Sequence, residues 1–244
     1  MKRTYVFVFV LAMVLGFYAQ AQATLTTIGQ AQYGGNNYNL IWDNDGPFGS
    51  IVWLDYTHDA KNWVNQRWTW ANGLNNSGTL TYYINPIYSV NWSGDWRLPT
   101  QNDCIYPGEL GYNGDGTYVW GYNITWSEMG HLFYAELGNK GFSDTSGNYV
   151  PDHGLLNTGP FTNLQGSSYW ANIKTNNAAG FVGYGWYFDF SLGLEDLKSP
   201  LDNLYALAVR PGDVSTVPEP GTMLLLGSGL MGLAGYGRKK LFKK

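Results

Sequence analysis

The chain has 244 residues, of which 44% are hydrophobic, 17% aromatic and 13% charged. Enough apolar side chains are present to bury a full core, which excludes a largely disordered protein. Residues 24–216 carry 7 Lys and Arg against 17 Asp and Glu, a net charge of about −10. This balance argues against nucleic acid as a partner, because a duplex binder needs clustered cations to neutralise the phosphates.

The N-terminal segment, residues 1–23, has the pattern of a secretory signal peptide. Lys2 and Arg3 precede an apolar stretch from Tyr5 to Tyr18, and Ala-Gln-Ala-Gln-Ala follows at residues 19–23. The short apolar stretch and the small residues after it disfavour the alternative, a permanent membrane anchor. We therefore expect export through the Sec translocon, cleavage by signal peptidase and one domain over residues 24–212.

Two segments have the periodicity of amphipathic helices. The first runs from Thr57 to Leu74, with Thr57 or Asp59 as its cap. Its expected inward face consists of Ala60, Trp63, Val64, Trp68, Ala71 and Leu74. The second runs from Ser127 to Leu137 and is opened by Thr125 and Glu128 at capping-box spacing. Its expected inward face consists of Met129, Leu132, Phe133 and Leu137.

The other apolar runs are short and predict strands. They are Leu40 to Trp42, Ile51 to Leu54, Leu80 to Ile84, Tyr118 to Tyr122, Ser168 to Ile173, Trp186 to Phe190 and Leu204 to Val209. In Trp186 to Phe190, aromatic residues at every second position predict a sheet with one buried face. Two main helices among short, twisted and mostly antiparallel strands predict an α+β domain.

Several phrases of the sequence resemble one known domain family. They are Ile51-Val-Trp-Leu-Asp-Tyr56, Trp96-Arg-Leu-Pro-Thr100, Ser127-Glu-Met-Gly-His131, Tyr169-Trp170, Trp186-Tyr-Phe-Asp-Phe190 and Tyr205-Ala-Leu-Ala-Val-Arg-Pro211. In this order they resemble the DUF1566 domain, also called the Lcl C-terminal domain, over residues 38 to 212. The resemblance implies a C-type-lectin-like fold and, for some members, binding of host or matrix glycans.

The phrase Trp96, Arg97, Leu98, Pro99 and Thr100 also has a local explanation as a corner between elements. Pro99 forces Leu98 into an extended conformation, and Thr100 can cap a short helix. We expect Arg97 to pair with a carboxylate inside the fold, since a buried arginine needs a partner. The same expectation applies to Arg210.

The chain departs from the family pattern over Cys104 to Asn123, where an insertion lies. This insertion is either a decorated loop or a ligand surface built from Tyr112, Asp115, Tyr118 and Trp120. Cys104 is the single cysteine, so no internal disulfide can form. We interpret it as a small buried residue rather than a reactive thiol.

Catalytic and metal-binding patterns are weak. No pair of acids has a spacing that identifies a glycoside hydrolase, and His58, His131 and His153 lack the spacing of a zinc site. His131 is interpreted as a core hydrogen-bonding residue. The oxygen-rich residues Asp43, Asn44, Asp45, Asn113 and Asp115 leave calcium open, although turn formation explains them as well. We therefore expect no enzyme, no metal and no cofactor.

The C-terminal segment has three parts: Val217, Pro218, Glu219 and Pro220, then an apolar run over residues 222–237, then Arg238, Lys239 and Lys240 within a basic tail, residues 238–244. Together they resemble the PEP-CTERM tail by which Gram-negative bacteria pass proteins to an exosortase. A helix over residues 222–237 is about 24 Å long, a marginal span of a bilayer core of about 30 Å. Residues 213–221 are the expected linker, and the cations should keep the tail cytoplasmic.

These observations predict an exported protein, transiently anchored in the inner membrane and then delivered to the cell surface or extracellular matrix. We expect its domain to be a non-catalytic, lectin-like module for glycan or another matrix polymer. The alternatives are a structural surface or biofilm protein without a specific ligand, and a glycan-active enzyme.

Overall fold

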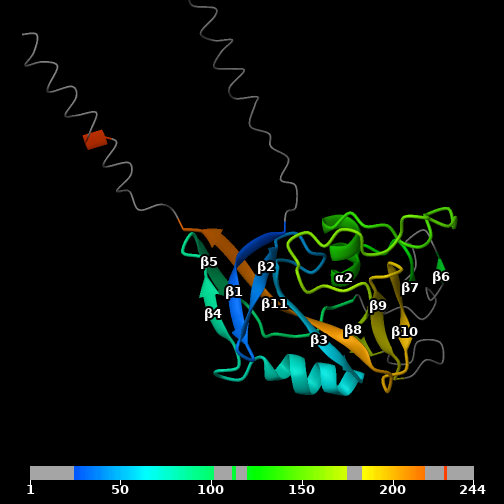
Figure 1. Cartoon of the computed structure of the whole chain (residues 1–244), viewed down its shortest axis with the longest axis horizontal. Coiled ribbons are helices and arrows are strands. Elements are labelled where there is room, and N and C mark those ends of the chain that lie inside the picture. The colour runs from blue at the N-terminus through cyan, green and yellow to red at the C-terminus, as the bar shows by residue number, and fades with distance from the viewer. Residues whose placement is uncertain (1–24, 102–111, 114–119, 175–182, 218–227, 230–244) are drawn as a thin grey trace, which may run out of the picture.

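Strands β3 (Ile51–Lys61) and β11 (Leu204–Thr216) lie at the centre of the domain (Figure 1). In this computed structural model the described residues are 25–101, 112–113, 120–174, 183–217 and 228–229. The remaining strands are β1 (Thr26–Tyr33), β2 (Asn36–Asp43), β4 (Thr81–Ile84), β5 (Tyr88–Trp92), β6 (Tyr112–Asn113), β7 (Trp120–Gly121), β8 (Ser168–Lys174), β9 (Gly185–Asp189) and β10 (Leu194–Lys198). The helical segments are η1 (Asn65–Ala71), α2 (Glu128–Gly130) and η2 (His131–Glu136).

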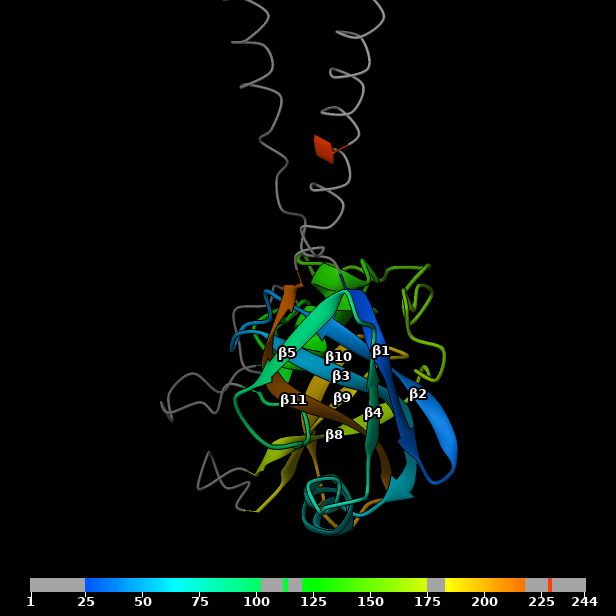
Figure 2. The ribbon, with the colours of Figure 1, turned by 90° about the vertical axis from the view of Figure 1, so that its left-hand side faces the viewer.

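The strands form one sheet with the order β4-β1-β2-β3-β11-β8-β9-β10-β7-β6. Most neighbours are antiparallel, whereas β11 pairs with β8, and β6 with β7, in parallel. The long strand β11 pairs with β3 through its first half and with β5 from Gly212 to Thr216 (Figure 2). Residues 213–216, expected to begin the linker, are therefore part of a strand.

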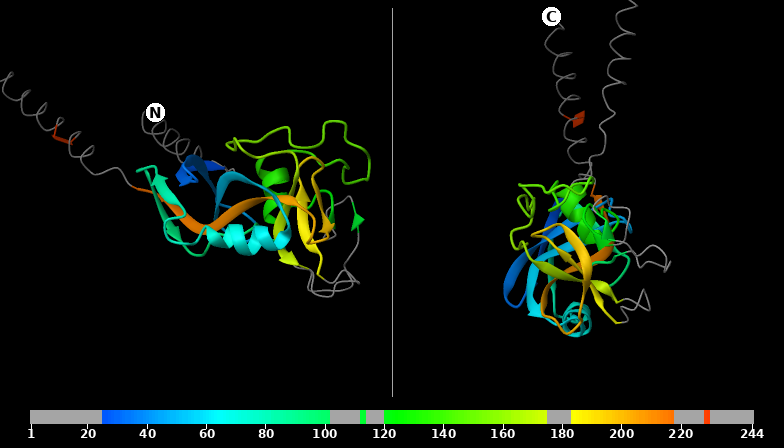
Figure 3. Two further views of the ribbon diagram at one scale, coloured as in Figure 1. Left: turned by 60° about the horizontal axis from the view of Figure 1, so that its bottom comes forward. Right: turned by 90° about the vertical axis from the view of Figure 1, so that its right-hand side faces the viewer.

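Both faces of the central sheet are buried. Along β3, Ile51 and Trp53 pack into one hydrophobic core, and Val52 and Leu54 pack into the other. The first core lies under α2 and η2, and the second lies against η1. Figure 1 and the right view of Figure 3 show these helical segments on opposite sides of the strands. A strand buried on both faces has no polar alternation, which explains the continuous apolar run at Ile51 to Leu54.

The α+β, C-type-lectin-like fold class is wrong. The structure is 43% strand and only 13% helical, so it is dominated by its sheet. The expected first helix began too early: Thr57 to Lys61 belong to β3, where Lys61 pairs with Leu204 and His58 with Ala206. Tertiary pairing with β11 overrides the helical periodicity of these five residues.

The helical register also differs from the expectation. Segment η1 is π-helical, and Asn72 N–H donates to Arg67 O five residues earlier. The wider turn leaves Val64 and Trp68 50% and 57% exposed, although both were expected to face inward. In the second helical segment Ser127, rather than Thr125, is the N-cap, accepting from Gly130 N–H. All four residues of its expected inward face are buried, as predicted.

All seven predicted strands overlap observed ones, although Tyr118 and Val119 of the fourth lie outside the described residues. The alternation of Trp186, Phe188 and Phe190 with half-buried neighbours is confirmed. Strands β1, β5, β6 and β10 were missed, because polar residues or a glycine interrupt their apolar positions. Among the described residues, no helix is both long and apolar enough to cross a membrane. The expected span over residues 222–237 lies almost entirely outside them.

The Trp96 to Thr100 corner is structural. Arg97 pairs with the buried carboxylate of Glu128 through two hydrogen bonds of 2.8 Å, as expected for a buried arginine. Thr100 N–H donates to the same carboxylate at 2.5 Å. Arg210 instead donates to Gly94 O and Tyr82 Oη, so its expected pairing with a carboxylate is wrong.

Candidate metal centre

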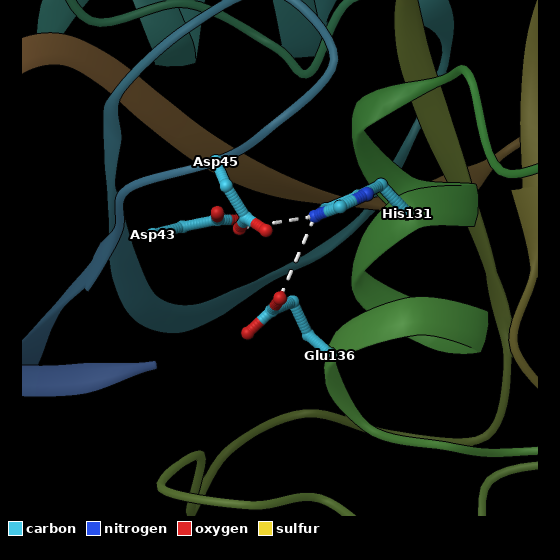
Figure 4. A group of neighbouring side chains, drawn as sticks. All are labelled: Asp43, Asp45, His131 and Glu136. Carbon is cyan, nitrogen blue, oxygen red and sulfur yellow. Dashed lines mark hydrogen bonds and ion pairs between the residues drawn. The ribbon is translucent and has the colours of Figure 1, made fainter. Parts of the chain in front are cut away.

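Four side chains that can ligate a metal ion converge where β2 ends and η2 begins (Figure 4). Asp43 and Asp45 approach from one side, and His131 and Glu136 approach from η2 on the other. One ligand atom of each residue lies within 4.8 Å of the ligand atom of every other. The site therefore joins two segments that are 86 residues apart in the chain.

The strand pairing fixes the position of Asp43. It is the last residue of β2, opposite Ile51 of β3, and only 1% of it is exposed. Trp53 Nε1 donates to Asp43 Oδ2 at 3.2 Å, which orients the carboxylate. The other oxygen, Oδ1, is buried and has no hydrogen-bond partner among the described residues. A buried carboxylate oxygen without a donor is costly, unless a ligand completes its environment.

The π-helical register of η2 brings His131 and Glu136 to the same face. In an α-helix, residues five apart are separated by about 140° around the axis. A π-helix places residues i and i+5 nearly in line, and Leu137 N–H donates to Leu132 O in this pattern. His131 Nε2 consequently lies 3.5 Å from Glu136 Oε1.

The distances from His131 to two of the acids suit a small cation. His131 Nε2 lies 3.4 Å from Asp45 Oδ1 and 3.5 Å from Glu136 Oε1. With metal–ligand bonds of about 2.1 Å, the edge of a ligand tetrahedron is about 3.4 Å. Glu136 is almost fully buried, whereas the Asp45 side chain is 46% exposed and forms the solvent side of the site.

The electrostatics show an excess of negative charge. Burial raises the pKa of Glu136 to about 7, and the nearby carboxylates of Asp43 and Asp45 add to this shift. Burial likewise raises the pKa of Asp43. In the described part of the chain, no lysine or arginine forms an ion pair with any of these three acids. A divalent cation would supply the missing positive charge.

The donor set points to a first-row divalent cation. Three carboxylates suit hard ions such as Mn²⁺, whereas an imidazole favours Zn²⁺ over Ca²⁺ or Mg²⁺. The sequence suggested Asp43 and Asp45 only as part of an oxygen-rich calcium pattern, and His131 only as a core residue. Glu136 was not considered as a ligand. At α-helical pitch a separation of five residues would place it about 140° around the axis from His131.

The expected ligand surface in the insertion is only partly described. Tyr112 forms part of β6, and Asp115 and Tyr118 lie outside the described residues, as does Cys104. Trp120 lies in β7 and packs, half-buried, against the core under α2. Val217 is described at the end of β11, where its N–H donates to Ile87 O. The other predicted tail residues lie outside the described part of the chain: Pro218, Glu219, Pro220, Arg238, Lys239 and Lys240.

Together these features define a domain dominated by a β-sheet, in which four side chains are close enough to hold a metal ion together. Residues 216–239 match the family model of the PEP-CTERM protein-sorting motif. The chain is therefore an exported protein that is anchored in a membrane before an exosortase processes it. Neither a curated protein nor a solved structure matches it. The resemblance to the DUF1566 domain finds no support in these comparisons.

Proposed function

We propose that this protein is an exosortase-processed component of the cell surface or matrix whose domain is a non-catalytic binding module built around a structural divalent cation. The observation that supports the cation most directly is Asp43: its buried Oδ1 has no hydrogen-bond partner among the described residues, and one of its carboxylate oxygens lies within 4.8 Å of a ligand atom of each of the other three residues. Four protein donors and no spare ligand position are typical of structural zinc sites, whereas catalytic sites keep a position open.

A structural cation also fits the compartment. Small exported domains are commonly stabilised by disulfides, and this chain has a single cysteine. A cation held by Asp43, Asp45, His131 and Glu136 would join the β2–β3 turn to η2 across the edge of the sheet. Such a cation would cross-link two distant segments of the chain, as a disulfide does in other exported domains.

A thermal unfolding experiment tests the cation. The full chain is purified in detergent, stripped with chelator, and titrated with Zn²⁺, Mn²⁺ or Ca²⁺. A site that is saturated a hundredfold above its Kd stabilises the fold by about 2.7 kcal/mol. For a domain of this size we expect Tm to rise by about 5–10 °C with Zn²⁺ or Mn²⁺.

The matched variants are Asp43→Asn, which keeps an acceptor for Trp53, and Asp152→Asn, which removes an exposed acid paired with Lys140. The first should lose the metal-dependent rise in Tm and the second should retain it. An equal rise in both variants, or no rise with any of the three ions, would contradict the structural cation.

For the partner of the module, we propose a glycan or another polymer of the matrix. The alternatives are a structural surface protein without a ligand and a glycan-active enzyme. A binding module holds an added oligosaccharide unchanged, a structural protein ignores it, and an enzyme releases shorter products. Incubation of the full chain with exopolysaccharide, followed by co-sedimentation and product analysis, separates the three.

A further inference from the structure

We infer that the groove between η1 and the Trp96 corner is a carbohydrate-binding site for a neutral oligosaccharide. The inference rests on the proposed binding function and names its site and ligand class. It uses none of the four cation ligands, and it lies on the opposite side of the central sheet from α2 and η2.

The groove is a hollow of about 200 Å³. Its polar and aromatic lining comes from Arg67, Trp68 and Asn72 of the η1 region, Asp95 and Arg97 before β6, and Asn172 of β8. A second hollow of about 180 Å³ shares Asp95 and Trp96 with the first. Together they reach the size of small-molecule sites, about 300–1,000 Å³.

Trp68 supplies an exposed aromatic surface that the fold itself does not use. It is 57% exposed, and its periodicity predicted an inward position. The Arg67 guanidinium lies 4.5 Å from the centroid of the Trp68 ring and 5.0 Å from that of Trp63. This cation–π contact couples the exposed ring to a buried one, and so limits its freedom before any ligand arrives.

The polar groups around Trp68 are available for hydroxyl groups. The side chains of Asn72, Asp95 and Asn172 form no hydrogen bond within the described part of the chain. Arg97 is already neutralised by Glu128, and Arg67 and Asp95 carry opposite charges. Amides and a carboxylate beside an aromatic ring match the hydroxyl groups and C–H faces of a sugar. Because the charges of Arg67 and Asp95 balance, the groove favours a neutral sugar over a charged one.

The wall between the two hollows is rigid. Trp96 N–H donates to Asn75 Oδ1 at 2.7 Å, and Asn75 Nδ2 donates to Trp96 O at 3.0 Å. Trp96 Nε1 donates to Tyr82 Oη at 2.7 Å, and the indole itself is buried. A preformed wall reduces the entropy lost on binding. Two hollows that share it suit a ligand of at least two sugar units.

Segment η1, which lines the groove, lies far from the attachment point of the tail. The start of β1 and the end of β11 lie on the same side of the domain, and η1 lies on the opposite side (Figures 1 and 2). The last strand leads directly into the sorting motif at residue 216. While the protein is anchored, η1 is therefore on the side of the domain opposite to that end.

Isothermal titration of the full chain in detergent with maltose, cellobiose and lactose tests this site, with a glucuronic acid disaccharide as the charged comparison. At least one neutral disaccharide should bind saturably, and Trp68→Ala should weaken it at least tenfold. The control is Tyr149→Ala, which removes an aromatic ring that is 60% exposed elsewhere. Absence of saturable binding, or equal affinity in the Trp68→Ala variant, would overturn the inference.

Repeating the sugar titration in chelator, and with the Asp43→Asn variant, tests whether sugar binding in the groove depends on the cation. Sugar binding that persists in both confirms that the groove acts without the metal. Sugar binding that disappears on metal removal or in Asp43→Asn would contradict an independent groove. If the parent chain binds sugar but no metal ion raises its Tm, the groove stands and the structural cation is rejected.

Discussion

His131 and Glu136 are five residues apart, yet His131 Nε2 lies 3.5 Å from Glu136 Oε1. The π-helical register of η2 produces this proximity. It places the His131 and Glu136 side chains on the helix face that points toward Asp43 and Asp45 (Figure 4). The same arrangement crowds three carboxylates, and the proposed cation would relieve their mutual repulsion.

Glu136→Gln should therefore change the stability of the fold in opposite directions in the metal-free and the metal-bound protein. In chelator at pH 8, removing one of three crowded carboxylates should stabilise the fold by about 1 kcal/mol, because like charges repel at short range. With Zn²⁺ or Mn²⁺ present, the variant should be less stable than the parent because a ligand is lost. Chemical denaturation with and without metal measures both, and a change of the same sign in both states would contradict a cation at this cluster.

Glu195 predicts a pH dependence that does not involve the metal centre. Burial raises its pKa from 4.5 to about 8, although Ser127 opposes the shift. Between these values the unfolded chain releases this proton and the folded chain keeps it. This group therefore makes stability fall as pH rises from about 4.5 to about 8.

Glu195→Gln should remove that part of the pH dependence and raise Tm most at pH 8. The nearby ionisable group is Tyr134, whose pKa burial raises well above its usual range, so it stays neutral throughout. Asp152→Asn, on the exposed surface, serves as the control. Parallel Tm curves for the parent and Glu195→Gln from pH 5 to pH 8 would contradict the prediction.

The Arg97–Glu128 pair predicts a large loss of stability. Glu128 is buried and accepts hydrogen bonds from both terminal nitrogens of Arg97 and from Thr100 N–H. Glu128→Ala leaves the guanidinium without its partner and should cost about 3 kcal/mol, or about 6–12 °C in Tm.

Replacing both members of the pair with methionine should recover a large part of that loss, since no charge is then left unpaired. Lys140→Met, which breaks an exposed pair with Asp152, is the comparison and should change Tm little. A Glu128→Ala variant as stable as Lys140→Met would show that the corner does not depend on this contact.

The sorting motif predicts where the protein accumulates. Replacing Pro218, Glu219 and Pro220 with alanine should leave most of the protein in the inner-membrane fraction, because the exosortase no longer recognises the tail. Ser215→Ala, within β11, should be released as the parent is. Fractionation and immunoblotting of cells that produce the exosortase measure this, and unchanged release of the triple variant would contradict it.

The sequence alone determined the features that depend on neighbouring residues. The sorting motif at residues 216–239, the capped helical segment with Met129, Leu132 and Phe133 inside, and the alternation from Trp186 to Phe190 are of this kind. Each arises from local spacing, which a single segment carries by itself. The need of Arg97 for a carboxylate was also predictable, because burying a guanidinium without one is too costly.

Only the tertiary structure decided the fold and the candidate sites. Pairing with β11 turned Thr57 to Lys61 into strand, and the π-helical turns moved Trp68 to the surface and Glu136 beside His131. The residues of the candidate cation site come from segments 86 residues apart. No local pattern encodes such a meeting, because it is fixed by strand register and helix pitch, which depend on the free energy of packing the whole domain.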